Sequence, residues 1–204
     1  MIKTVKNFLS KDELNLAVAY WHIKKSTLKP CPQVKNSFSD YSDTLGETIL
    51  TQKQKLVEKH VGEKLLPTYT FTRMYKKGNV LEKHYDRPSC EVSVSINYYA
   101  DKPWSLKYKK LQHERGPVDK KAKVVSVFTK PGDAVIYEGM QYEHWRDAYK
   151  GEECMQIFIH YVRANGKYKL FDRDGRVNHN EKTEDKFRRI WAWSGQNQDG
   201  NRIL

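Results

Sequence analysis

The first third of the chain carries the apolar spacing of two helices. Ser10 followed by Glu13 has the pattern of a capping box, in which each residue satisfies a backbone donor of the first turn. The apolar positions expected on the buried face of this helix are Leu14, Leu16, Ala17 and Tyr20. A second helical pattern covers residues 44–66, and Pro67 is expected to end it. Its expected apolar face consists of Leu50, Leu56, Val57 and Val61.

After Pro67 the pattern changes to the alternation of β-strands. In residues 91–99 the apolar face carries Val92, Val94 and Ile96, and the opposite face carries Ser93, Ser95 and Asn97. We expect the apolar face to pack against helices and the small polar face to leave room for a ligand inside a barrel. Further strands are expected at 2–8, 68–75, 103–109, 124–128, 134–137 and 155–162, and a polar loop at 37–43. Many short strands after N-terminal helices favour an α+β, mainly β fold of the sandwich or jelly-roll type with flanking helices.

One expected strand face combines a cation with aromatic side chains. In residues 68–75, Arg73 shares its face with Tyr69, Phe71 and Tyr75. Two interpretations stay open, namely a face exposed to solvent and an arginine that lines a pocket.

The composition is that of a folded protein with a positive charge balance. The 204 residues carry 37 basic and 25 acidic side chains, which gives a formal net charge of +12. This charge favours an acidic partner, such as nucleic acid, an anionic substrate or an anionic surface, and a basic solvated exterior explains it equally well. The lysines between residues 107 and 123 are dispersed, which favours solvation of loops over a dedicated groove.

The cysteines and the apolar segments of the chain bear on where in the cell the protein is expected. Cys31, Cys90 and Cys154 form no C-x-x-C pair, which argues against a disulfide framework or a structural zinc cluster. The first ten residues are too polar for a secretory signal, and no apolar run approaches the length of a membrane span. We therefore expect a soluble protein of the reducing cytoplasm with no membrane partner.

The strongest candidate chemistry lies at His84-Tyr85-Asp86. Residues two apart in an extended strand point to the same face, so His84 and Asp86 can offer a nitrogen and an oxygen to one metal ion. A third ligand is expected from His144, which follows the Pro-Gly-Asp turn and apolar strand at 130–137. Two histidines and a carboxylate with open positions form the facial triad of non-haem Fe(II) oxygenases. His160 competes with His144, but its place within an apolar strand is more typical of a core or barrel-lining histidine.

The order and spacing of these motifs resemble the Fe(II)/2-oxoglutarate-dependent dioxygenases, nearest their prolyl-4-hydroxylase-like branch. The matching pieces are Asn7-Phe8-Leu9-Ser10 with Asp12-Glu13, Tyr75 with Gly78, His84-Tyr85-Asp86, Ile96-Asn97-Tyr98 with Trp104, Pro131-Gly132-Asp133, and His144. The resemblance implies a double-stranded β-helix (jelly roll) and Fe(II) bound by His84, Asp86 and His144. It also implies that 2-oxoglutarate is oxidised to succinate and carbon dioxide, while O₂ serves to hydroxylate a C–H bond of a protein side chain, such as proline, or of a small molecule.

The resemblance further implies a single oxygenase domain over residues 1–204. Residues 1–67 would form a helical support region, residues 68–162 the β-helix core, and residues 163–204 a C-terminal extension. Within the extension, the aromatic and basic segment 186–193 is expected to form a closing helix.

This chain departs from the family pattern at the co-substrate anchor. The distal carboxylate of 2-oxoglutarate needs a cation, preferably an arginine that can bind both oxygens. The relatives place a basic residue where this chain has Cys154. Arg146 is the slightly preferred replacement and Arg73 the other candidate. Tyr75 and Gln156 are expected to assist by hydrogen bonding.

Two other functional classes stay open from the sequence. The missing basic anchor supports a non-catalytic β-helix binding module that keeps the fold and a metal. The positive charge supports an oxygenase that acts on nucleic acid, or a plain nucleic-acid binder. The second class is not favoured, because the arginine-rich C-terminal signature of the nucleic-acid demethylases is not visible after His144.

Overall fold

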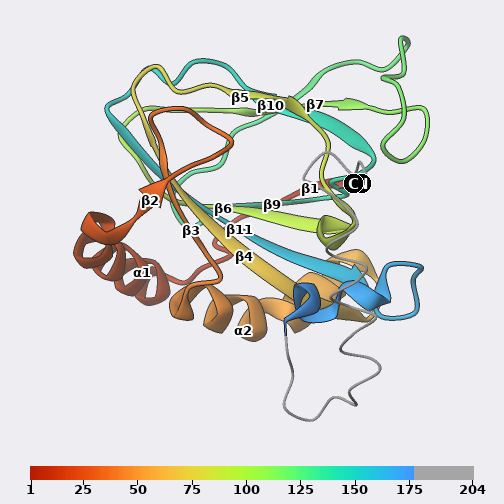
Figure 1. Cartoon of the computed structure of the whole chain (residues 1–204), viewed down its shortest axis with the longest axis horizontal. Coiled ribbons are helices and arrows are strands. Elements are labelled where there is room, and N and C mark those ends of the chain that lie inside the picture. The colour runs from red at the N-terminus through yellow and green to blue at the C-terminus, as the bar shows by residue number, and fades with distance from the viewer. Residues whose placement is uncertain (177–204) are drawn as a thin grey trace.

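A computed structural model describes residues 1–176, and residues 177–204, which include the helix expected at 186–193, lie outside the described part of the chain. Within residues 1–176, two antiparallel sheets lie over one another, and the helices lie beyond the larger sheet (Figure 1). The larger sheet contains, in spatial order, β1 (Ile2–Val5), β9 (Ala134–Tyr137), β6 (Val92–Ala100), β11 (Glu153–Arg163), β4 (Leu65–Lys76), β3 (Phe38–Tyr41) and β2 (Lys29–Pro30). The smaller sheet contains β5 (Leu81–His84), β10 (Tyr142–Arg146), β7 (Leu106–Lys110) and β8 (Val125–Val127).

Local capping signals set ends of both α-helices that the structure describes in residues 1–176. Helix α1 (Lys11–Lys24) starts at Ser10, whose Oγ accepts from the backbone N–H of Glu13 at 3.2 Å. The backbone N–H of Ser10 in turn donates to the Glu13 carboxylate at 2.7 Å, so the predicted capping box is confirmed. Helix α2 (Thr44–Val61) ends at Gly62, which has a left-handed backbone with φ of 85°. The short 3₁₀ segments are η1 (Lys25–Thr27), η2 (Pro88–Cys90) and η3 (Lys169–Gly175).

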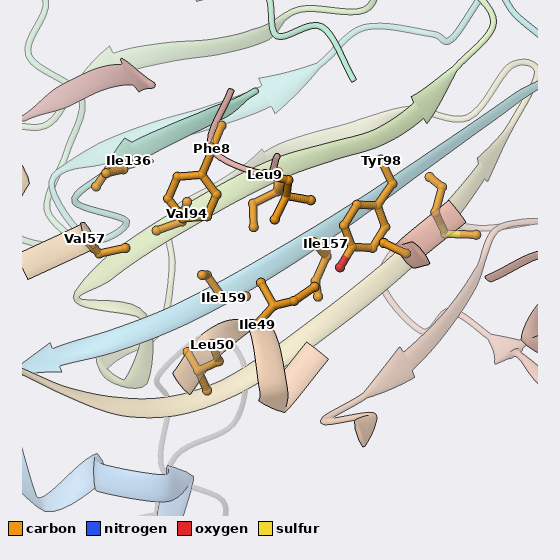
Figure 2. Close-up of a cluster of buried hydrophobic side chains, with 14 of the residues drawn as sticks. Phe8, Leu9, Ile49, Leu50, Val57, Val94, Tyr98, Ile136, Ile157 and Ile159 are labelled. Carbon is orange, nitrogen blue, oxygen red and sulfur yellow. The ribbon is translucent and has the colours of Figure 1, made fainter. Parts of the chain in front are cut away.

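The main hydrophobic core lies between the helices and one face of the larger sheet (Figure 2). The predicted apolar face of β6 is part of it, since Val92, Val94 and Ile96 are fully buried. Leu50 and Val57 of α2 are buried against the same sheet. Each such side chain contributes roughly 1.5–3 kcal/mol on burial. This packing holds the helices on one side and leaves the other face of the sheet to the smaller sheet.

Three local predictions were wrong. Residues 37–43 contain strand β3 rather than only a loop, because pairing with β4 supplies backbone hydrogen bonds that the local sequence does not reveal. Helix α2 ends at Gly62 and does not continue to Pro67. Pro67 instead lies within β4, outside the stretch of β4 that pairs with β3. The N–H that proline lacks therefore costs no hydrogen bond to β3. Leu16 is 64% exposed, and Trp21 is buried on the inner face of α1 instead.

The described chain is mainly β with N-terminal helices against one sheet, as the sequence predicted. Two facing antiparallel sheets are consistent with the predicted jelly roll. The division of the chain at residues 67 and 162 stays a prediction. Among residues 1–176, no helix has the length and apolar character needed to cross a membrane.

Candidate active site

Three candidate metal ligands meet where β5 and β10 pair. His84 ends β5 and stands directly opposite His144 of β10 in the antiparallel register, and their ring centroids are 4.3 Å apart. Asp86 follows β5 and points toward both rings. Its Oδ1 lies 3.5 Å from Nε2 of His144 and 3.9 Å from Nε2 of His84. These two nitrogens and one oxygen form a set that could hold a metal ion.

Backbone contacts orient both imidazole rings toward the same point. Nδ1 of His84 lies 2.7 Å from the carbonyl oxygen of Glu82, and Nδ1 of His144 lies 3.0 Å from that of Tyr142. A carbonyl oxygen can only accept, so Nδ1 carries the hydrogen in each ring. Nε2 is therefore the ring nitrogen left to bind a metal in each histidine, and both Nε2 atoms face Asp86.

The charges of His84 and Asp86 also suit a metal. Burial, assisted by the neighbouring imidazole of His144, lowers the pKa of His84 to about 4. Burial alone would raise the pKa of Asp86, but His144 outweighs it and holds that pKa well below its usual value. Burial alone would lower the pKa of His144, and the adjacent Asp86 carboxylate instead raises it. At neutral pH, His84 is therefore neutral and Asp86 is ionised, as metal ligands must be.

Two further residues position Asp86. The hydroxyl of Ser93 donates to Oδ2 of Asp86 at 2.9 Å, and the backbone N–H of Asp86 donates to the carbonyl of Gly139 at 3.0 Å. The sequence placed Ser93 on the polar face of β6 without assigning it a partner. No local pattern pointed to Gly139, because its role depends on a segment far away in the chain.

The three candidate ligands line a cavity of about 500 Å³. Six of its sixteen lining residues are tyrosines or phenylalanines, so part of the wall in front of the ligands is aromatic. The lining side chains are Pro32, Gln33, Tyr41, Tyr69, Phe71, Arg73, His84, Tyr85, Asp86, Arg87, Cys90, Tyr137, His144, Phe158, His160 and Asp174.

Arg73 presents a cation to this cavity. Its side chain is 4% exposed and lies over Phe71 and Phe158, with 5.0 and 5.6 Å between guanidinium and ring centroids. Its Nη1 donates to the Tyr75 hydroxyl at 2.9 Å, and its Nη2 donates to the Gln33 side chain. No carboxylate of the described residues 1–176 forms an ion pair with it, and its Nε has no hydrogen-bond partner there. A buried guanidinium in such surroundings favours the binding of an anion.

The structure places the other predicted anchoring residues behind the cavity wall. Arg146 is 2% exposed, donates to the carbonyl oxygen of Trp104 at 2.8 Å and lies over that ring. It does not line the cavity. Gln156 is the cross-strand partner of Arg73, but its amide donates to Cys154 Sγ at 3.3 Å. Of the two candidate anchors, Arg73 lines the cavity, whereas Arg146, which the sequence slightly preferred, does not.

An ion pair from the C-terminal extension closes one side of the cavity. Asp174 has a fully buried side chain and accepts two hydrogen bonds from Arg87, both at 2.7 Å. The hydroxyls of Ser89 and Tyr41 donate to the same carboxylate at 2.7 and 2.6 Å. Arg87 also lies 4.4 Å from the ring centroid of Tyr69. The sequence gave no indication of this contact, because Arg87 and Asp174 lie far apart along the chain.

His160 also lines the cavity, but it lies outside the set formed by His84, Asp86 and His144. Its Nδ1 is 2.9 Å from the Ser93 hydroxyl, and its ring lies 4.6 Å from that of Tyr69. Burial lowers its pKa to about 4. This position agrees with the interpretation of His160 as a barrel-lining histidine.

No protein-family model and no curated protein sequence matches the chain. Several solved structures do match the chain in fold. A prolyl-4-hydroxylase from Pseudomonas putida aligns with a TM-score of 0.60 at 14% identity, over 79% of this chain and 92% of that one. An oxidoreductase of the 2OG-Fe(II) oxygenase family from Burkholderia pseudomallei aligns with a TM-score of 0.60 at 12% identity, over 81% and 86%.

A third structure is the epimerase SnoN in complex with Fe³⁺, α-ketoglutarate and nogalamycin RO. It aligns with a TM-score of 0.64 at 10% identity, over 100% of this chain and 91% of that one. At these identities the likeness concerns the fold. The chain therefore shares its fold with the Fe(II)/2-oxoglutarate-dependent oxygenases, prolyl-4-hydroxylases among them.

Proposed function

We propose that this protein is an Fe(II)- and 2-oxoglutarate-dependent oxygenase that hydroxylates a C–H bond of a protein side chain or a small molecule. The observation that supports this most directly is the convergence of His84, Asp86 and His144 on one point of the cavity wall. A neighbour of the same fold was solved with iron and α-ketoglutarate.

The three ligands fit Fe(II) in number and in chemical type. Two imidazole nitrogens and one carboxylate oxygen would hold the ion and would leave room for a bidentate 2-oxo acid and O₂. When bound, iron and 2-oxoglutarate supply the oxidising power for C–H hydroxylation. The chain itself supplies an ionised Asp86, two rings held by backbone carbonyls, and a cavity wall that is partly aromatic.

Arg73 is the proposed anchor for the distal carboxylate of 2-oxoglutarate. It is buried, it lines the cavity, and it lacks a carboxylate partner within residues 1–176. Its hydrogen bond to Tyr75 fixes the guanidinium plane, which is what bidentate binding of a carboxylate needs. Arg146 stays the alternative, since it is buried without a carboxylate partner in the same part of the chain.

Binding of the co-substrate tests this proposal. We would load the protein with Fe(II) without oxygen, add 2-oxoglutarate and measure the visible metal-to-ligand charge-transfer band. The band is expected in the wild type and in Asp147→Ala, which removes an exposed carboxylate outside the cavity. Asp86→Ala is expected to abolish it. Release of succinate then serves to screen substrates.

Stoichiometric iron without a band in the wild type would overturn the proposal. The non-catalytic binding module, supported by Cys154 at the position of the usual basic anchor, would then explain the fold better. A nucleic-acid partner and a cytoplasmic location stay predictions.

A further inference from the structure

The Asp86 carboxylate faces two different sets of donor atoms. Its Oδ1 points toward the Nε2 atoms of His84 and His144, at 3.9 and 3.5 Å. Its Oδ2 instead accepts from the Ser93 hydroxyl at 2.9 Å. The same hydroxyl lies 2.9 Å from Nδ1 of His160, so His160 stands on the Oδ2 side of the carboxylate.

Cys90 completes the second set. Ligand atoms of Asp86, Cys90 and His160 all lie within 4.8 Å of one another. Cys90 and His160 are both buried, and both line the cavity that holds the first set, so an ion that enters the cavity can reach either set. Cys90 Sγ lies 3.0 Å from the Tyr69 hydroxyl, which can donate to a thiolate and stabilise it.

The donor types of the two sets select different ions. The first set offers only nitrogen and oxygen, which suits Fe(II), whereas the second adds a thiol. Three protein ligands with sulfur, nitrogen and oxygen donors, next to an open cavity, are typical of accessible zinc sites. The sequence argued against a structural zinc cluster because no C-x-x-C pair is present, whereas this set needs only one cysteine.

We propose that Asp86, Cys90 and His160 form a second metal-binding position, which takes a thiophilic divalent ion such as Zn²⁺ or Co²⁺ and shares Asp86 with the first set. Binding releases the thiol proton of Cys90 to solvent and forms a metal–sulfur bond. Because Asp86 is shared, an ion at this position competes with Ser93 for Oδ2 and weakens the hold of Asp86 on iron.

Cobalt provides a direct test, because a cobalt–thiolate bond absorbs in the near ultraviolet and a site of nitrogen and oxygen does not. Metal-free full-length protein would be titrated with Co²⁺ alone. The wild type is expected to show the thiolate-to-cobalt charge-transfer band with one equivalent of thiolate-bound cobalt. His84→Ala, which removes a ligand of the first set only, is expected to keep this band. The result thus stands apart from the proposed oxygenase activity.

Cys90→Ser is expected to lose the band, while Cys31→Ser and Cys154→Ser keep it as matched cysteine controls. His160→Ala is expected to weaken cobalt binding at least tenfold and serves as the second variant if Cys90→Ser does not fold, as checked by near-ultraviolet circular dichroism. Absence of the band in the wild type at saturating Co²⁺ would overturn the proposal. So would its persistence in Cys90→Ser or its loss in His84→Ala.

Discussion

The backbone of Gly139 lies directly against the side chain of Asp86. A Cβ atom on Gly139 would be 2.0 Å from Oδ2 and 2.7 Å from Cβ of Asp86. The two residues are also joined by a hydrogen bond of 3.0 Å from the Asp86 N–H to the Gly139 carbonyl. Any side chain at position 139 must therefore displace the carboxylate that we propose as an iron ligand.

Gly139→Ala should weaken iron binding by about 10–100-fold, the usual effect of disturbing a group that orients a metal ligand. The measurement is a titration of Fe(II) without oxygen. Gly78→Ala is the control, because Gly78 has a φ of +81° and nothing lies within 4 Å of its added Cβ. The control should lose roughly 1 kcal/mol of stability through backbone strain and keep its iron affinity. Equal losses of iron affinity in both variants would contradict the steric explanation.

Replacing the proposed anchor should affect 2-oxoglutarate rather than iron. Arg73→Met removes charged hydrogen bonds worth about 1.5–3 kcal/mol, so the affinity for 2-oxoglutarate should fall about 10–100-fold. Arg146→Met, which changes a cation on Trp104 outside the cavity, should leave that affinity within about threefold. Titration of the charge-transfer band with 2-oxoglutarate measures both. The reverse ranking would identify Arg146 as the anchor.

The buried pair of Arg87 and Asp174 should contribute strongly to the stability of the fold. Asp174→Asn leaves the Arg87 guanidinium without its counter-charge, and breaking a buried pair in this way costs about 3–5 kcal/mol. Glu152→Gln is the matched control, because its pair with Lys77 is exposed to solvent and should contribute little to stability. Urea unfolding of both variants measures the difference. Similar urea midpoints for Asp174→Asn and Glu152→Gln would show that Asp174 does not pair with Arg87 in solution.

Asp101 should make the stability depend on pH in the acid range. The Tyr149 hydroxyl, followed by the backbone N–H of Glu152, lowers the pKa of Asp101 to about 2. The unfolded chain has a higher pKa, about 4, so the folded state binds the proton less readily. This contribution to stability is therefore complete above pH 4 and is lost as the pH falls toward 2.

Asp101→Asn should accordingly melt at a lower temperature than the wild type at pH 7, and the gap should narrow between pH 4 and pH 2. Tyr149→Phe removes the main cause of the shift and should show part of the same behaviour. Thermal melts across this range provide the measurement. A gap between wild type and Asp101→Asn that is the same at pH 2 and pH 7 would speak against the assignment.

The sequence by itself determined the features that depend on neighbouring residues. The capping box of Ser10 and Glu13 was predictable because its atoms lie within one helical turn. The two faces of β6 were predictable because alternation is a property of the strand itself. The pairing of His84 with Asp86 as candidate ligands followed from their spacing of two residues.

Only the tertiary structure decided how distant segments meet. The register of β5 on β10 places His144 opposite His84, while the register of β11 carries His160 to the Ser93 side of Asp86. The sequence slightly preferred Arg146 to Arg73, although strand alternation allows either side chain to point inward. The packed structure places Arg73, and not Arg146, on the cavity wall. The roles of Asp174 and Gly139 could not be predicted from the sequence, because they depend on contacts with segments far away in the chain. Local spacing indicated His84 and Asp86 as ligands. Which other residues surround them was decided by long-range packing, which no local sequence pattern encodes.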